Sequence, residues 1–156
     1  MDAPNKDLKH PLAHHDKLCF LKNIIQSPNI SVGDYTYYDD LEDVQNFERN
    51  VKYHFEFTGD KLVIGKFCML ASGVSFIMNG ANHLTKSISS YPFSIFGGDW
   101  SNAMAGKSFP NKGNTIIGND VWIGHNIIQY DVPAIKQVLG YEFEGKKVDT
   151  LLMSRL

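Results

Sequence analysis

Apolar residues in the middle of the chain recur at every sixth position, which is neither helical spacing nor the alternation of an amphipathic strand. Within residues 61–83, Ile64, Leu70 and Phe76 stand six apart, and a small residue directly follows each of the first two. Another small or branched residue stands four positions after each of these two starts. A period of six is typical of a parallel β-helix, in which each coil buries its apolar edge only against neighbouring coils. The pattern therefore predicts a mainly β chain made of stacked coils.

The same period appears on both sides of this stretch. Two linked hexads start at Ile117 and Ile123, each followed by glycine, and a partial first coil is predicted around Val32. In each hexad we expect the first residue and the residue four positions later to point inward. The predicted inward set is Val32, Thr36, Ile64, Cys68, Leu70, Val74, Ile117, Val121, Ile123 and Ile127.

Segments without the period define the rest of the organisation. We predict a polar arm over residues 1–18, a β-helix domain over 19–134 and a helical segment over 135–156. Val148, Leu151 and Leu152 give the apolar stripe of that predicted C-terminal helix. Within the domain, a loop insertion over about 84–114 interrupts the coils, and it is too rich in aromatic residues to be disordered. We expect the insertion to pack against another surface, and a single chain offers it little.

Composition and charge narrow the class of partner. The chain has 156 residues, 43% of them hydrophobic, and a formal net charge of −2 without any block of basic residues. Nucleic acid and anionic membranes are therefore not expected as partners. No apolar run approaches the roughly 20 residues of a spanning helix, and the first residues do not resemble a signal peptide, so a cytoplasmic protein is expected. Cys19 and Cys68 lack metal-type spacing and are expected to be reduced and structural.

Five segments, in order and at their observed distances, carry a family resemblance: VGDYTYYDD, IGKFC, FIMNGANH, YPF-x-x-F and TIIGNDVWIG. They resemble the hexapeptide-repeat xenobiotic acetyltransferases, and among these the streptogramin A (virginiamycin) O-acetyltransferases more than the chloramphenicol enzymes. The resemblance covers about residues 20–128. It implies a left-handed parallel β-helix, a homotrimer with active sites between subunits, and an insertion that closes the site of a neighbour.

The resemblance also implies a reaction and its residues. The protein would be an enzyme that moves acetyl from acetyl-CoA to a hydroxyl of a streptogramin A or chloramphenicol antibiotic, giving drug resistance. His83, in the NGANH motif, matches the catalytic histidine, which takes the proton of the attacking hydroxyl. Tyr37, Phe55, Asn82 and Trp122 match positions at the antibiotic site. Phe55 stands where some members have tyrosine. No residue is assigned to acetyl-CoA, and no metal is implied.

The sequence departs from the family after the VWIG segment. Members continue with several more coils, which supply much of the groove for the pantetheine arm, whereas here Val132-Pro133 and the EGKKVDTLL segment follow almost at once. A second hypothesis is therefore a shortened relative, weakly active or inactive, that persists as a folded remnant or an assembly module. A third is a zinc-dependent β-helix hydratase using His54, His83 and His125, although the residues that flank these histidines match no such site.

Overall fold

The protein is built from strands of two or three residues joined by tight turns. The computed structural model describes residues 3–84, 88–124, 133, 136–137 and 147–149. The strands are β1 (Leu18–Phe20), β2 (Ile30–Val32), β3 (Tyr37–Asp39), β4 (Val51–Lys52), β5 (Leu62–Ile64), β6 (Met69–Leu70), β7 (Phe76–Ile77), β8 (Thr115–Ile117), β9 (Trp122–Gly124) and β10 (Lys147–Asp149). Among the described residues, six 3₁₀ helices accompany them: η1 (Leu21–Asn23), η2 (Val44–Asn50), η3 (Glu56–Thr58), η4 (Asn79–Ala81), η5 (Phe93–Phe96) and η6 (Gly98–Met104).

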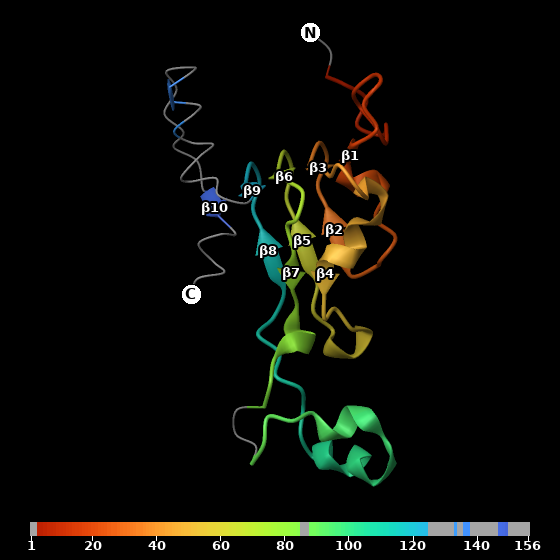
Figure 1. The fold of residues 1–156 in the computed structure, drawn as a ribbon, viewed down its shortest axis with the longest axis vertical. Helices are drawn as coiled ribbons and strands as arrows, with labels where there is room; N and C mark the ends of the chain where they lie inside the picture. The colour runs from red at the N-terminus through yellow and green to blue at the C-terminus, as the bar shows by residue number, and fades with distance from the viewer. Residues whose placement is uncertain (1–2, 85–87, 125–132, 134–135, 138–146, 150–156) are drawn as a thin grey trace.

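The strands form three sheets, and the chain visits them in turn. Their orders are β2-β5-β8, β1-β3-β6-β9-β10 and β4-β7. Every pairing is parallel except that of β1 with β3, which is antiparallel. Figure 1 shows the equivalent strands of successive circuits lying side by side, from the first (orange) to the third (teal). Repeated circuits with parallel pairing in each sheet are compatible with a β-helix, so the prediction of a mainly β chain of stacked coils is confirmed at this level.

The predicted inward residues form the core. Cross-strand register aligns Val32 with Ile64 and Ile64 with Ile117, so one ladder runs through all three coils. Every member of the set up to Ile123 is buried except Ile117, which is half-buried. Ile117 lies on β8, which within the described residues has a neighbouring strand on one side only. Ile127 lies outside the described residues.

Sequence periodicity missed part of the core at the N-terminal end of the stack. Leu21, Tyr38 and Phe47 are fully buried or nearly so. Tyr38 holds the hexad start six positions after Val32, and its ring meets that of Phe47 from η2 at a centroid distance of 5.1 Å. Burial and a hydrogen bond to Asp40 raise the pKa of the Tyr38 hydroxyl. The segment 39–50, which contains η2, thus packs against the first coil.

The corners after β2 and β5 explain why glycine follows Val32 and Ile64. A Cβ added at Gly33 would lie 2.6 Å from the Gly65 carbonyl carbon, and one at Gly65 would lie 2.5 Å from the Gly118 oxygen. Such distances leave no room for a side chain between coils. Two residues further on, Tyr35, Phe67 and Asp120 all adopt positive φ, so the three corners repeat one backbone conformation.

Both ends of the chain differ in detail from the predictions. Residues 3–17 are mostly exposed, as expected for a solvated arm, but His10 Nδ1 lies 2.9 Å from the carbonyl oxygen of Leu18. Val148 was predicted to lie in a helix; instead it lies in β10, whose backbone pairs in parallel with β9. The alternation Lys-Val-Asp suits a strand beside an existing sheet edge better than it suits a helix. Leu151 and Leu152 lie outside the described residues.

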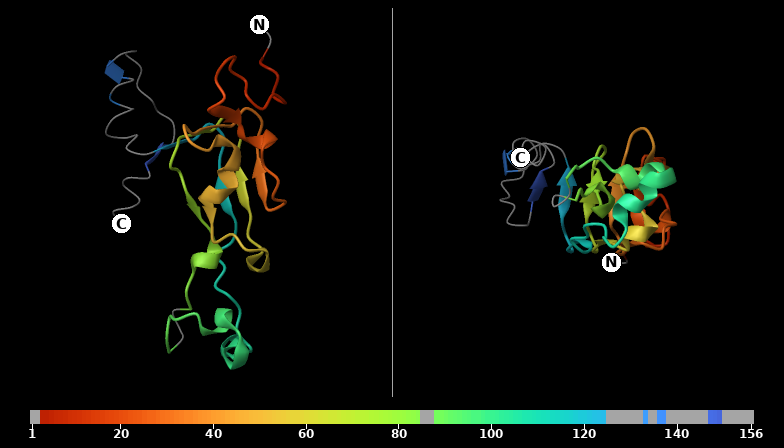
Figure 2. Two further views of the ribbon diagram at one scale, coloured as in Figure 1. Left: turned by 45° about the vertical axis from the view of Figure 1, so that its right-hand side comes forward. Right: turned by 90° about the horizontal axis from the view of Figure 1, so that it is seen from below.

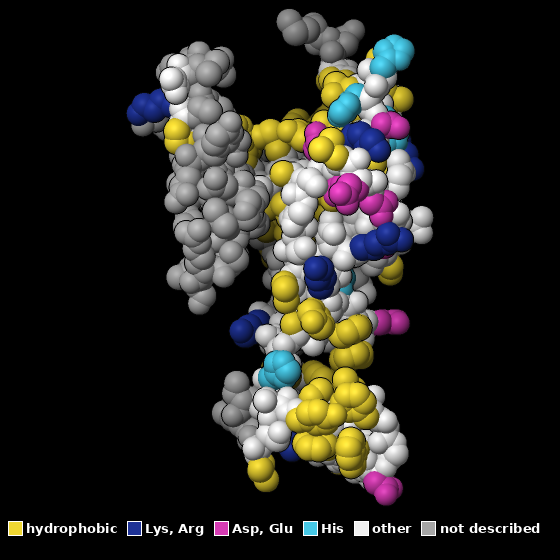
Figure 3. Space-filling model, viewed as in Figure 1, with side chains coloured by type: hydrophobic (Ala, Val, Ile, Leu, Met, Phe, Trp, Pro, Cys, Tyr) yellow, Lys and Arg dark blue, Asp and Glu magenta, His cyan; other side chains and the backbone are white. Residues whose placement is uncertain are grey.

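The insertion between β7 and β8 projects away from the coils, at the bottom of Figure 1 and of the left view of Figure 2. Its described part contains η5 and η6 and no strand. Tyr91 contacts the rings of Phe93 and Phe96 at centroid distances of 4.7 and 5.5 Å. These rings stay exposed nevertheless, and Trp100 is 51% accessible. Figure 3 shows the resulting hydrophobic patch at the lower end of the molecule.

Candidate active site

His83 follows a turn that only glycine permits at its centre. Strand β7 leads into η4 (Asn79–Ala81), and Asn82 ends this short helix. A Cβ at Gly80 would lie 2.3 Å from the Tyr53 carbonyl oxygen and 2.5 Å from the Phe55 ring. The Gly80 amide donates a hydrogen bond to that same Tyr53 oxygen, at 3.0 Å. The NGANH segment is therefore pressed against residues 53–55, which fixes where His83 leaves the coil.

The histidine is exposed, but its ring is oriented. His83 Nδ1 lies 3.1 Å from the backbone oxygen of Ser90, across the start of the insertion. A carbonyl oxygen can only accept, so in the neutral ring Nδ1 carries the hydrogen and Nε2 is left with a free lone pair. The ring therefore has the tautomer that a general base needs at Nε2.

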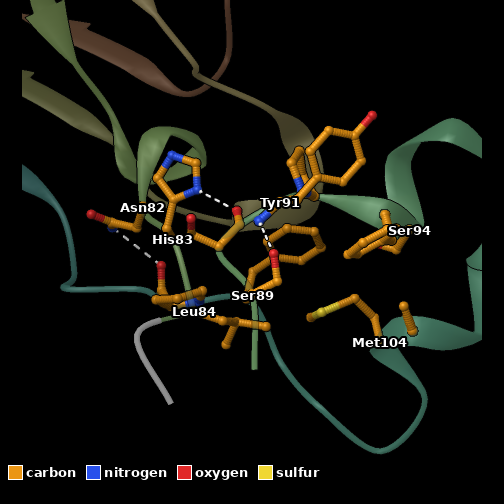
Figure 4. A pocket seen from close by; sticks show the side chains of 13 residues that line it. Asn82, His83, Leu84, Ser89, Tyr91, Ser94 and Met104 are labelled. Atoms are coloured by element: carbon orange, nitrogen blue, oxygen red, sulfur yellow. Dashed lines mark hydrogen bonds between the residues drawn. The ribbon is translucent and has the colours of Figure 1, made fainter. Parts of the chain in front are cut away.

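A small hollow opens beside His83, between the turn and the insertion (Figure 4). Its lining includes Asn82, Leu84, Ser89, Tyr91 and Met104. The cavity volume is about 70 Å³. Pockets for drug-sized ligands usually occupy about 300–1,000 Å³. Within the described residues, this hollow is therefore too small to enclose a drug-sized molecule.

The five predicted site residues fall into two groups. Asn82 and His83 line the hollow, and Asn82 Nδ2 donates to Asn79 Oδ1 at 2.8 Å and to the Pro110 oxygen at 3.2 Å. Phe55 packs over Gly80, behind the turn. These three residues are therefore brought together around the turn.

Tyr37 and Trp122 belong to a different part of the coil surface. Both align with Met69, in one row across β3, β6 and β9. Neither lines the hollow, and their strands lie at the end of the coils away from the insertion (Figure 1). Burial, with a smaller effect of Asp39, raises the pKa of the Tyr37 hydroxyl. Within one chain the predicted site is thus split between two faces.

Sequence reasoning missed the polar group that lies under the turn. Asp60 is only 1% exposed, and its Oδ2 accepts hydrogen bonds from the Asn79 backbone nitrogen at 3.0 Å and from Asn79 Nδ2 at 2.8 Å. Burial alone would raise the pKa of Asp60, but hydrogen bonds from Thr58 and Asn79 outweigh it and hold that pKa below its usual value. A useful signal was the Gly59-Asp60 turn, where an acidic residue stands two positions before strand β5.

The metal hypothesis finds no arrangement to support it in the described part of the chain. That part holds no group of three or more His, Cys, Asp or Glu side chains suited to a metal ion. His54 Nε2 instead lies 2.9 Å from the backbone oxygen of Asp60. His125, the third histidine of the hydratase hypothesis, lies outside the described residues.

Among the helices of the described residues, none is long and apolar enough to cross a membrane.

No protein-family model matches the chain. A probable macrolide acetyltransferase of Lysinibacillus sphaericus is 55% identical over 84 residues, which are 53% of this chain and 47% of the relative. The virginiamycin A acetyltransferase of Staphylococcus aureus is 47% identical over 112 residues, 71% of this chain and 50% of the relative. A chloramphenicol acetyltransferase of Klebsiella aerogenes is 40% identical over 119 residues, 74% of this chain and 56% of the relative.

The chain thus spans about half the length of the curated relatives it matches. At these identities, the resemblance inferred from the NGANH and NDVWIG motifs is confirmed. Over the matched residues, the chain is similar to acetyltransferases named for virginiamycin A, chloramphenicol and macrolides.

Proposed function

We propose that the protein is an O-acetyltransferase that moves an acetyl group from acetyl-CoA to a hydroxyl of an antibiotic of the streptogramin A or chloramphenicol class, and so confers resistance. The observation that carries the proposal is the placing of His83. Its Nδ1 is committed to the Ser90 oxygen, its other nitrogen is available, and the ring borders a hollow in a chain related to acetyltransferases.

The proposed step needs one base and no covalent enzyme intermediate. Nε2 of His83 takes the hydroxyl proton as the substrate oxygen attacks the thioester carbonyl, and the resulting tetrahedral oxyanion collapses to expel the CoA thiolate. The imidazolium then returns the proton to the thiolate, so the products are the acetyl ester and free CoA. Acetyl-CoA is a co-substrate here, and the chemistry calls for no metal.

The rest of the proposed site comes from a second subunit. The two faces that carry the predicted residues are apart in one chain, and the insertion leaves its aromatic rings exposed. In a homotrimer, the insertion of one subunit would contact the coils of the next. This contact would bury the aromatic rings and bring the two faces together at one site. In this arrangement Tyr37, Phe55, Asn82 and Trp122 contact the antibiotic beside His83.

The proposed architecture is a left-handed parallel β-helix over residues 19–134, preceded by the arm of residues 1–18. The parallel sheets and the repeated corner conformation support a β-helix. The domain carries the insertion of about 84–114, and it is followed by the C-terminal segment of residues 135–156, whose strand β10 pairs with β9. A cytoplasmic location is proposed, where acetyl-CoA is made and used.

A second candidate function rests on a specific observation, the departure of the sequence from the hexad pattern after the VWIG segment, residues 121–124. If coils that bind the pantetheine arm are not present, the protein is a weakly active or inactive relative that persists as a folded remnant or assembly module. This candidate predicts weak or absent binding of acetyl-CoA, whereas the first predicts saturable binding.

A thiol-release assay separates the two candidates. Acetyl-CoA is offered with a panel of streptogramin A, chloramphenicol and macrolide antibiotics, and CoA release is measured for the parent, His83→Ala and His15→Ala. A general base contributes roughly 10²–10⁴-fold, so His83→Ala should lower kcat by about that factor. His15 is exposed on the N-terminal arm and serves as the matched control. Turnover that persists in His83→Ala would refute the assignment, and an inactive parent would favour the second candidate.

A further inference from the structure

One buried carboxylate holds the turn that leads to His83. Asp60 directly precedes the second coil, between Thr58 and strand β5, and it is almost wholly inaccessible. Its Oδ1 lies 2.5 Å from Thr58 Oγ1, and its Oδ2 receives two hydrogen bonds from Asn79. Leaving a buried carboxylate unpaired is costly, so these contacts tie Asp60 to the turn at Asn79.

The side chain of Asn79 also forms hydrogen bonds with residues at both ends of the insertion. Its Nδ2 also donates to the Gly113 oxygen at 2.7 Å, and its Oδ1 accepts from the Lys112 nitrogen at 2.9 Å and from Asn82 Nδ2 at 2.8 Å. The side-chain amide therefore has every donor and acceptor engaged. It joins the residue before His83 to the segment where the chain returns to the coils.

We infer that Asp60 is a positioning residue of the proposed acetyl-transfer site: acting through Asn79 and Asn82, it fixes the turn that orients His83 and clamps the two ends of the insertion together. The inference rests on the proposed function for its effect on turnover. Its effect on the turn does not depend on activity, because the clamp consists of hydrogen bonds within the chain.

The single hydroxyl hydrogen of Thr58 indicates which substitution of Asp60 should keep the hydrogen bonds. Thr58 Oγ1 has one hydrogen but two acceptors in reach, the Phe55 oxygen at 2.6 Å and Asp60 Oδ1 at 2.5 Å. An amide at position 60 would donate to Thr58 Oγ1, which would then donate to Phe55, while the amide oxygen still accepts from Asn79. Asp60→Asn should therefore preserve the clamp, whereas Asp60→Ala removes it.

The test compares Asp60→Ala, Asp60→Asn and Asn79→Ala with Thr36→Val. Thr36 is also fully buried and hydrogen-bonded, to the Gly65 oxygen and the Cys68 nitrogen, but it lies inside the coils and makes none of these contacts to the turn. The first readout is the imidazole ¹⁵N NMR signal of His83, identified by its loss in His83→Ala. The second is the set of steady-state constants for both substrates.

Asp60→Ala and Asn79→Ala should shift the His83 signal and lower kcat by about 10- to 100-fold, because small misplacement of a catalytic group is costly, with KM little changed. Asp60→Asn should restore the signal and keep kcat within a few-fold of the parent. If Asp60→Ala does not fold, Asn79→Ala carries the comparison. Three results would overturn the inference. The His83 signal could stay unmoved in folded Asp60→Ala or Asn79→Ala, or it could shift equally in Thr36→Val. The kcat of Asp60→Asn could also fall as far as that of Asp60→Ala. An inactive parent would refute the proposed function, while the NMR comparison still decides the role of Asp60.

Discussion

Buried polar side chains are concentrated beneath the candidate active site. Of the four among the described residues, Thr36 joins two coils in the interior, whereas Thr58, Asp60 and Asn79 form one connected group under the turn that leads to His83. Polar groups are retained in an interior only where partners satisfy them. The interior of the coils is otherwise apolar. Hydrogen bonds, and not apolar packing alone, therefore hold the backbone of this turn in one conformation.

The pH dependence of stability should carry the signature of Asp60. Its pKa is lowered in the folded protein, so its contribution is present above the ordinary aspartate value, about 3.9, and is lost as the pH falls through the folded pKa. Asp60→Asn cannot lose a proton and lacks this contribution at every pH. Thermal unfolding from pH 7 to pH 2 should show the melting-temperature difference between parent and variant narrowing below about pH 4. A constant difference across that range would mean that Asp60 does not titrate in this way.

Among the elements, the corners of the coils are the most constrained. Gly33 and Gly65 allow successive corners to approach to van der Waals distance, and the residue two positions after each adopts positive φ. Hexads are therefore defined as much by the small residue that follows each start as by the apolar start itself.

Two glycines at equivalent corners make a matched pair for testing this constraint. Gly65→Ala would bring a methyl group to 2.5 Å from the Gly118 backbone oxygen, whereas a Cβ at Gly118 meets nothing within 4 Å in the described chain. Overpacking of this kind costs about 1–3 kcal/mol, so Gly65→Ala should lower the denaturation midpoint clearly. Gly118→Ala should stay within about 0.5 kcal/mol of the parent. Equal losses for both, measured by urea unfolding, would show that coil contact is not the reason for the glycine.

The periodicity predicted the coil strands well because β2, β5, β6, β8 and β9 each coincide with a hexad start. Strands β1 and β10 could not be predicted in this way, since Leu18–Phe20 and Lys147–Asp149 lie outside the period and are strands only because an existing sheet offers them an edge. The helix predicted around Val148 was wrong for the same reason. Apolar spacing in a short segment does not reveal which neighbour will be available.

The site was predictable only as far as local chemistry extends. The NGANH motif pointed to His83 and Asn82, and both line the hollow. Asp60 was missed because its importance comes from a contact with Asn79, nineteen positions away. That Tyr37 and Trp122 do not meet His83 in one chain is likewise a property of the fold, and no motif spacing encodes it.

At the scale of the whole molecule, the exposed aromatic cluster of the insertion requires an explanation. Phe96 and Trp100 are 59% and 51% exposed, and they lie beside other rings rather than singly. Contiguous apolar surface of this kind usually marks an interaction site. The proposed homotrimer would bury it against the coils of a neighbour.

Light scattering coupled to gel filtration tests this assembly. The parent should elute with about three times the chain mass of 17.6 kDa, and Trp100→Glu should shift it towards the monomer by placing a charge in the contact. Leu41→Glu alters a residue that is 71% exposed and is not part of the insertion, so it should leave the mass unchanged. A monomeric parent in which the insertion still resists proteolysis would contradict the proposed assembly.

The stacking of coils has a consequence for how the molecule unfolds. In a one-dimensional array each repeat is stabilised by its nearest neighbours, and the second coil, with β5 and β6, has coil strands on both sides. Strand β8 of the third coil has one such neighbour within the described residues. The two tryptophans lie in the insertion and in the third coil, at positions 100 and 122. Intrinsic fluorescence therefore follows the insertion and the third coil, and not the second coil, which has coil strands on both sides.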